Sequence, residues 1–122
     1  MAEEISITGR LNILNGTYRA DFNPGTIKAD LASNLSESGV VASTGTAAAI
    51  DTSNVATYGL CYLRNVTLTD NILIGREDGG TFRELITLLP GEFALFRLST
   101  ANIYHKRSGS EDTLLQYFVQ SA

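Results

Sequence analysis

The feature that most restricts the fold is a Pro-Gly pair set between two apolar runs, within the stretch Leu85 to Ser99. Pro90 lacks a backbone donor, and Gly91 loses more conformational entropy in a helix than any other residue, so a helix here is disfavoured. The same pair suits the two central positions of a type II turn. We therefore predict two strands, Leu85–Leu89 and Glu92–Leu98, that meet at a tight corner.

The N-terminal segment predicts a hairpin. Apolar residues recur at every second position from Ile5 to Ile13, which is the period of a strand, and Gly9 takes the interrupted slot, as at a bulge or kink. Asn15-Gly16 follows and favours a type I′ turn. Folding the chain about this pair predicts the cross-strand pairs Ile13–Tyr18, Leu11–Ala20 and Arg10–Asp21.

The remaining chain alternates short apolar runs with Gly- or Pro-marked turns, and no long window has a helical repeat. This pattern predicts an all-β protein: one antiparallel β-sandwich domain over residues 1–122, jelly-roll-like, with the N-terminal β-hairpin. Residues 32–57 are either an extended arm or a loop. Their uncharged tract 38–50 leaves open a flat strand, a flexible arm or a segment packed against a neighbour. The further strands expected are Thr26–Leu31, Tyr58–Val66, Ile72–Ile74, Phe82–Leu89, Asn102–Lys106 and Thr113–Gln120.

The charge balance excludes some partners. Nine basic and thirteen acidic residues give a net charge of −4, whereas nucleic acids and anionic membranes bind clustered positive charge. No apolar run approaches the roughly 18 residues of a membrane helix. The acidic opening Met-Ala-Glu-Glu lacks the apolar core of a signal peptide. We therefore expect a soluble protein made in a cytoplasm, without nucleic acid or membrane as its partner.

The sequence shows no set of residues typical of a catalytic site. His105 is the single histidine, which excludes a histidine cluster for zinc, and we expect it on an exposed or edge strand. Cys61 lies in an apolar run without the cationic surroundings that activate a thiol, so a Cys61–His105 nucleophile–base pair is disfavoured. We expect no enzyme activity, no cofactor and no metal.

Two further patterns have simple structural interpretations. Glu77, Asp78, Glu84 and Glu92 are interleaved with arginines and lack the ligand spacing of a calcium loop, so they indicate solvated turns. The Gly-rich segment 75–80 joins two strands rather than opening a helix, and so lacks the helix N-terminus of a phosphate-binding loop.

The apolar residues instead point to assembly. Several expected strands are apolar on both faces, although one sandwich has a single interior. The second cover is either a long loop of the same chain or another subunit, and the excess of Arg over Lys is typical of interfaces. In Glu92–Leu98 we expect Ala94, Phe96 and Leu98 to face the interior. The residues expected at an interface are Val40, Val41, Ile50, Phe93, Leu95 and Arg97.

Three runs carry a resemblance to a known family: Tyr58–Asn65 (YGLCYLRN), Asn71–Gly75 (NILIG) and Leu88–Leu98 (LLPGEFALFRL). Together with the opening hairpin, they resemble small structural proteins of tailed-bacteriophage virions. The resemblance implies a β-sandwich virion component, such as a capsid decoration (cement) protein or a small tail or connector protein. For a decoration protein, the expected partners are the major capsid protein lattice and further copies in a homotrimer. Residues 32–57 have no counterpart in it.

The expected function is therefore to decorate and stabilise the capsid by binding the assembled shell, in the virion, after synthesis in the bacterial host cytoplasm. A tail, fibre or head–tail joining protein of the same fold is the alternative. An alternative of another class is a carbohydrate- or ligand-binding β-sandwich module, although the absence of Trp weighs against sugar stacking.

Overall fold

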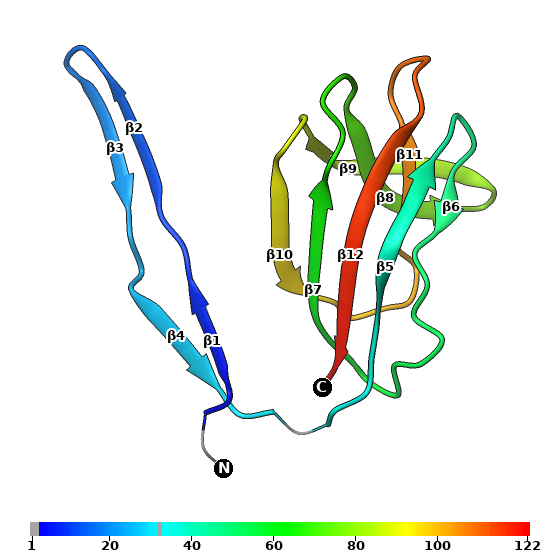
Figure 1. Cartoon of the computed structure of the whole chain (residues 1–122), viewed down its shortest axis with the longest axis horizontal. Helices are drawn as coiled ribbons and strands as arrows, with labels where there is room; N and C mark the ends of the chain where they lie inside the picture. The colour runs from blue at the N-terminus through cyan, green and yellow to red at the C-terminus, as the bar shows by residue number, and fades with distance from the viewer. Residues whose placement is uncertain (1–2, 32) are drawn as a thin grey trace. The chain divides into compact units, whose positions relative to one another are not determined.

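The computed structural model describes residues 3–31 and 33–122, and the regular elements of these residues are all β-strands (Figure 1). The chain divides into two compact units, one within residues 1–32 and one from Ser33 to Ala122. We call the described part of the first unit, residues 3–31, the ribbon, and the second unit the sandwich. The all-β antiparallel sandwich expected from the sequence is confirmed, and its jelly-roll topology stays a prediction.

The ribbon is a two-stranded antiparallel structure with a break in the middle. β1 (Ile5–Thr8) pairs with β4 (Thr26–Ala29), and β2 (Leu11–Asn15) pairs with β3 (Tyr18–Phe22). The break falls at Gly9 on one side, where the alternation is interrupted. The N-terminal hairpin predicted from the period-two pattern is therefore present.

The hairpin turn differs from the prediction in type and register. Asn15 pairs with Tyr18, so the central residues are Gly16 and Thr17, and the second strand is shifted by two positions from the expected register. Gly16 alone has a positive φ, of 60°, as at the first central position of a type II′ turn. The type I′ assignment was therefore wrong. A shift of two keeps every side chain on its expected face because the strand period is two.

The sandwich consists of two four-stranded antiparallel sheets. The first has the order β10-β7-β12-β5 and lies in front in Figure 1; the second has the order β6-β11-β8-β9. The strands of the first sheet are β5 (Ser36–Ser43), β7 (Tyr58–Asn65), β10 (Phe93–Arg97) and β12 (Thr113–Ser121). Those of the second are β6 (Ala48–Ala49), β8 (Ile72–Asp78), β9 (Thr81–Leu88) and β11 (Tyr104–Arg107).

The Pro-Gly corner carries the chain from one sheet to the other. Gly91 has a φ of 84°, and the Glu92 amide donates to the Leu89 carbonyl at 2.9 Å, as in a type II turn. β9 and β10, on either side of it, belong to different sheets, so both can direct apolar side chains into one core. That core consists of Ile50, Val55, Cys61, Leu63, Ile72, Ile74, Leu88, Leu98, Ile103, Leu115 and Val119.

The sandwich occupies a shorter interval than the 1–122 that we expected, because all of its strands come from the second unit. Within 32–57, β5 is neither arm nor loop: it pairs with β12 over eight positions, from Ser36 to Ser43. Of the three readings of the uncharged tract, the strand is the one found there. Ala32 lies outside the described residues.

Candidate functional site

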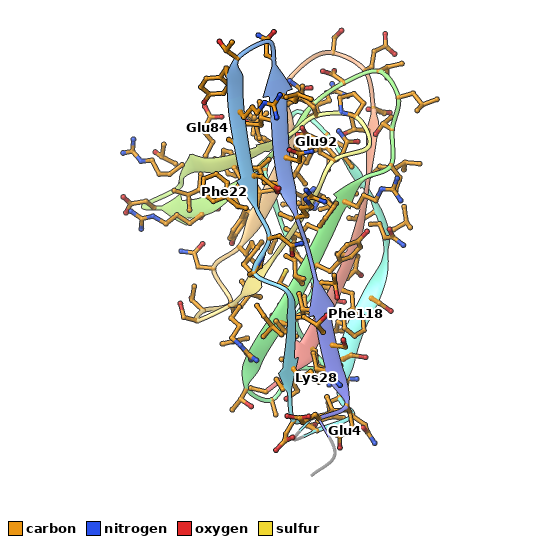
Figure 2. The ribbon with its side chains drawn as sticks, turned by 90° about the vertical axis from the view of Figure 1, so that its left-hand side faces the viewer. Glu4, Phe22, Lys28, Glu84, Glu92 and Phe118 are labelled. Atoms are coloured by element: carbon orange, nitrogen blue, oxygen red, sulfur yellow. The ribbon has the colours of Figure 1, made fainter. Side chains whose placement is uncertain are left out.

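The ribbon has one apolar face, which no other part of residues 3–31 covers. Alternation along β2 and β3 places five apolar side chains and Asn15 on this face, and the larger apolar ones are well exposed, with Leu11 at 53% and Phe22 at 64%. Phe22 is labelled on β3 in Figure 2. We call these residues the ribbon's apolar face: Leu11, Ile13, Tyr18, Ala20 and Phe22.

The opposite face of β2–β3 is largely polar. It carries Asn12 and Asp21 as one cross-strand pair and Leu14 and Arg19 as the next. Asp21 also accepts two hydrogen bonds from the Arg10 guanidinium, at 2.7 and 2.9 Å, so these charges form an ion pair although the register places Asn12, and not Arg10 as expected, opposite Asp21. The ribbon is thus amphipathic, and a two-stranded ribbon has no second layer with which to bury its apolar side.

The sandwich has a second exposed apolar surface, on the outer side of the sheet β10-β7-β12-β5. Phe93 is 62% exposed and Leu95 39%, and the Phe93 ring stacks on Tyr62 of the neighbouring strand with centroids 6.0 Å apart. We call the following residues the outer sheet face: Val40, Tyr62, Arg64, Phe93, Leu95, Arg97, Leu114 and Phe118. Figure 2 labels Phe118 on β12.

The predicted interface residues separate into two groups. Val40, Phe93, Leu95 and Arg97 lie on the outer sheet face, while Ala94, Phe96 and Leu98 face the core as expected. Contrary to the prediction, Val41 packs partly against the core and Ile50, at 3% exposed, belongs to it. Their apolar character is explained by the interior and needs no partner.

Sequence reasoning missed the ribbon as a surface. Its alternating pattern was visible from Ile5 to Ile13, but the expectation of one domain gave those side chains a place in a shared core. The signal that could have found them is the polar and charged set on the opposite face, which includes Arg19 and Asp21.

We expected His105 on an exposed or edge strand, but in the structure it is buried. It is 1% exposed on β11, and its Nδ1 lies 2.6 Å from the Ser43 hydroxyl on β5, so the pair links the two sheets. Burial lowers the pKa of His105 below its ordinary value of 6.5. Ser43 is fully buried as well, so this serine–histidine pair is sealed from substrate and acts as a bond within the core.

Cys61 lies on the inner face of β7 and is completely buried. Burial raises its pKa to about 12, so the nucleophilic thiolate does not form at neutral pH. Among the described residues, no group of three or more His, Cys, Asp or Glu side chains is arranged to hold a metal ion.

A cleft of about 180 Å³ opens between the sheets where β8 and β9 approach the segment 96–103. Ile74, Leu85 and Phe96 give it an apolar lining, and Arg76 and Arg97 contribute its charge. Ser99, Thr100 and Asn102 add polar groups to its lining, and none of its lining residues carries a carboxylate.

Comparisons with protein-family models, curated proteins and solved structures gave no match to this chain. Within residues 3–31 and 33–122, no helix is long and apolar enough to cross a membrane.

Proposed function

We propose that this chain is a structural protein of a bacteriophage virion, which decorates the capsid and stabilises it by binding the assembled shell. The observation that carries the proposal is the amphipathic ribbon, whose apolar face is not covered by any other part of residues 3–31. The motifs that resemble small virion proteins, in β7, β8 and β10, supply the biological setting.

The ribbon is suited to a protein that acts only in an assembly. A monomeric soluble protein seldom exposes a continuous apolar surface of this kind without a partner. Leu11, Tyr18 and Phe22 on one side of two short strands provide aliphatic and aromatic anchors of the type that dominates interface energies. The polar opposite face keeps the ribbon compatible with water when its apolar face is buried.

Stabilisation would follow from mass action. A protein that binds the assembled shell and not its separated subunits shifts the equilibrium towards the shell, and many weak sites add up over one particle. No catalytic step is required. The two titratable groups that could have supplied one, Cys61 and His105, are buried in the sandwich core.

The direct experiment counts the copies of this protein in purified virions and compares particles that carry it with particles that lack it. Decoration predicts on the order of hundreds of copies, distributed over the shell, and a lower temperature of particle disruption when the protein is absent. About a dozen copies or fewer, located at one vertex or along the tail, would favour a tail, fibre or joining protein. Absence from the particles would refute a virion role.

A matched pair of variants tests the ribbon within this function. Leu11→Asp places a charge on the apolar face, whereas Leu14→Asp makes the same change on the opposite face of the same strand, where Leu14 is 65% exposed. Added back to particles that lack the protein, the Leu11 variant should show reduced occupancy and the Leu14 variant normal occupancy. Equal occupancy would exclude the apolar face from binding.

A further inference from the structure

We propose that the ribbon of one copy lies on the outer sheet face of a second copy, and that the two copies exchange ribbons reciprocally. The inference deepens the proposed function and rests on its premise that exposed apolar faces are docking surfaces. The inference names the partner of each apolar face. Every copy has both the ribbon's apolar face and the outer sheet face, and the first covers the second in the other copy.

The two faces match in chemistry. Each is an antiparallel pleated surface with aliphatic and aromatic side chains, and two such surfaces pack face to face at about 10 Å. The ribbon contributes Leu11, Ile13 and Phe22, and the sheet contributes the stacked pair Tyr62–Phe93 with Leu95. The stack holds two rings in place before docking, which lowers the entropy lost on binding.

The charges around the two faces are complementary. The outer sheet face carries two arginines, Arg64 and Arg97, and none of the residues that define it is acidic. Residues 3–31 carry four acidic and three basic side chains, a net charge of −1, and the acidic excess lies at the base of the ribbon, with Glu3, Glu4 and Asp30. Opposite signs at the margins favour contact between a ribbon and a sheet over contact between two sheets, which would bring four arginines together.

The areas favour a reciprocal pair. From Ile5 to Asn15 the ribbon is about 36 Å long and about 10 Å wide. The outer sheet face is about 19 Å by 26 Å, so a docked ribbon contacts it over about 26 Å of its length, which is about 260 Å². A single contact is far below the roughly 800 Å² per partner of a standard stable interface, whereas two reciprocal contacts give about 520 Å² per partner, or about 1,000 Å² in total, which is the lower bound of a specific interface. A two-fold pair therefore fits, in place of the trimer expected for a decoration protein.

The test combines the mass of the full-length protein with amide hydrogen exchange. Leu95→Asp charges the outer sheet face at a partly exposed position and leaves the core untouched; Leu114→Asp on β12 is a second variant of the same face. Leu68→Asp, at an exposed loop position outside both faces, is the control. Light scattering gives the mass, and exchange in β2 and β3 reports whether the ribbon is covered.

The expected result is a wild-type mass of two copies, which the control retains. Leu95→Asp should weaken the dimer by about 30-fold or more and should remove amide protection from the ribbon, although the substitution is in the other unit. A wild-type monomer with a protected ribbon would mean that the ribbon covers its own sheet, and would overturn the inference. A dimer whose ribbon protection is unchanged by Leu95→Asp would also overturn it, as would a mass of three copies.

The outcome is separable from that of the proposed function. A dimer that behaves as expected but is absent from virions would refute the virion role and leave the exchange of ribbons supported. The opposite outcome is a protein that is abundant on the shell but monomeric in solution, and whose ribbon protection does not change with Leu95→Asp. That outcome would support the virion role and refute the exchange of ribbons.

Discussion

Replacing Asn65 by Ala should be among the most costly changes in the sandwich, because one buried side chain there connects two sheets and a loop. Asn65 ends β7 in the first sheet, and its Nδ2 donates to the Leu88 carbonyl of the second sheet at 3.0 Å and to the Asp70 carbonyl at 2.8 Å. Its Oδ1 accepts from the Thr67 amide at 3.0 Å and from the Thr67 hydroxyl at 2.8 Å. Asn65 itself is fully buried.

The expected loss of stability follows from what remains after the truncation. Each intramolecular hydrogen bond contributes about 1 kcal/mol net, but a buried carbonyl left without a donor costs about 1–3 kcal/mol. Leu88 lies in the core, so its carbonyl cannot recover a partner from bulk water, whereas Asp70 and Thr67 are in a partly exposed loop. We expect Asn65→Ala to lower the free energy of unfolding by about 3 kcal/mol.

Asn102 supplies the matched control. It also makes two side-chain hydrogen bonds to backbone, with the amide and the carbonyl of Glu77 at 2.9 and 2.8 Å, but in an exposed position. Asn102→Ala should cost less than about 1 kcal/mol, because water replaces both partners. Urea titration of each variant gives the two values, provided that the slope with denaturant is unchanged. A cost at Asn65 no larger than at Asn102 would refute the reasoning from burial.

Three further predictions concern single residues. A Cβ at Gly75 would overlap with the Arg83 carbonyl, so Gly75→Ala should destabilise the sandwich by more than about 2 kcal/mol, while Gly79→Ala, where a Cβ meets open space, should cost about 1 kcal/mol in the same titration. Gly16→Val forces a β-branched residue to positive φ, so amide exchange should accelerate in β2 and β3; unchanged exchange there would contradict the placement of Gly16 in the turn. His105 has a lowered pKa when folded, so the unfolded chain binds the proton first: the melting temperature should fall as the pH decreases from about 7 to about 5, and His105→Gln should have a shallower dependence.

The parts of the fold that could be predicted are those that depend on local backbone chemistry and on the two-residue repeat of side chains along a strand. The Pro90-Gly91 corner and the inward set Ala94, Phe96 and Leu98 depend on a few adjacent residues, and both are confirmed. The hairpin register was less certain because Asn15-Gly16 and Gly16-Thr17 both suit a two-residue turn. Positive φ at Gly16 satisfies either choice, so the sequence does not distinguish the two registers.

The parts that could not be predicted depend on long-range contacts. Ser43 and His105 are 62 residues apart, and a lone histidine beside a charged segment reads as exposed until the strands that bury it are paired. The division into two units has the same origin. The ribbon's alternating side chains enter a shared core only if another sheet packs against them. The residues of such a sheet lie outside 3–31, so the pattern within 3–31 does not predict whether this packing occurs.

The amphipathic ribbon has a consequence for how an assembly of this protein would be controlled. Two strands with one face uncovered are marginally stable in water, so burial of Leu11, Ile13 and Phe22 on a partner supplies much of the free energy that orders the ribbon. Ordering and docking are then one equilibrium, and it is favourable only where a receiving face is present. The outer sheet face needs no such help, because β7 and β12 are held by the sandwich core through Leu63 and Leu115. Under the proposed exchange, a rigid receiver and a ribbon stabilised by docking allow free copies to remain soluble while paired copies become resistant to dissociation.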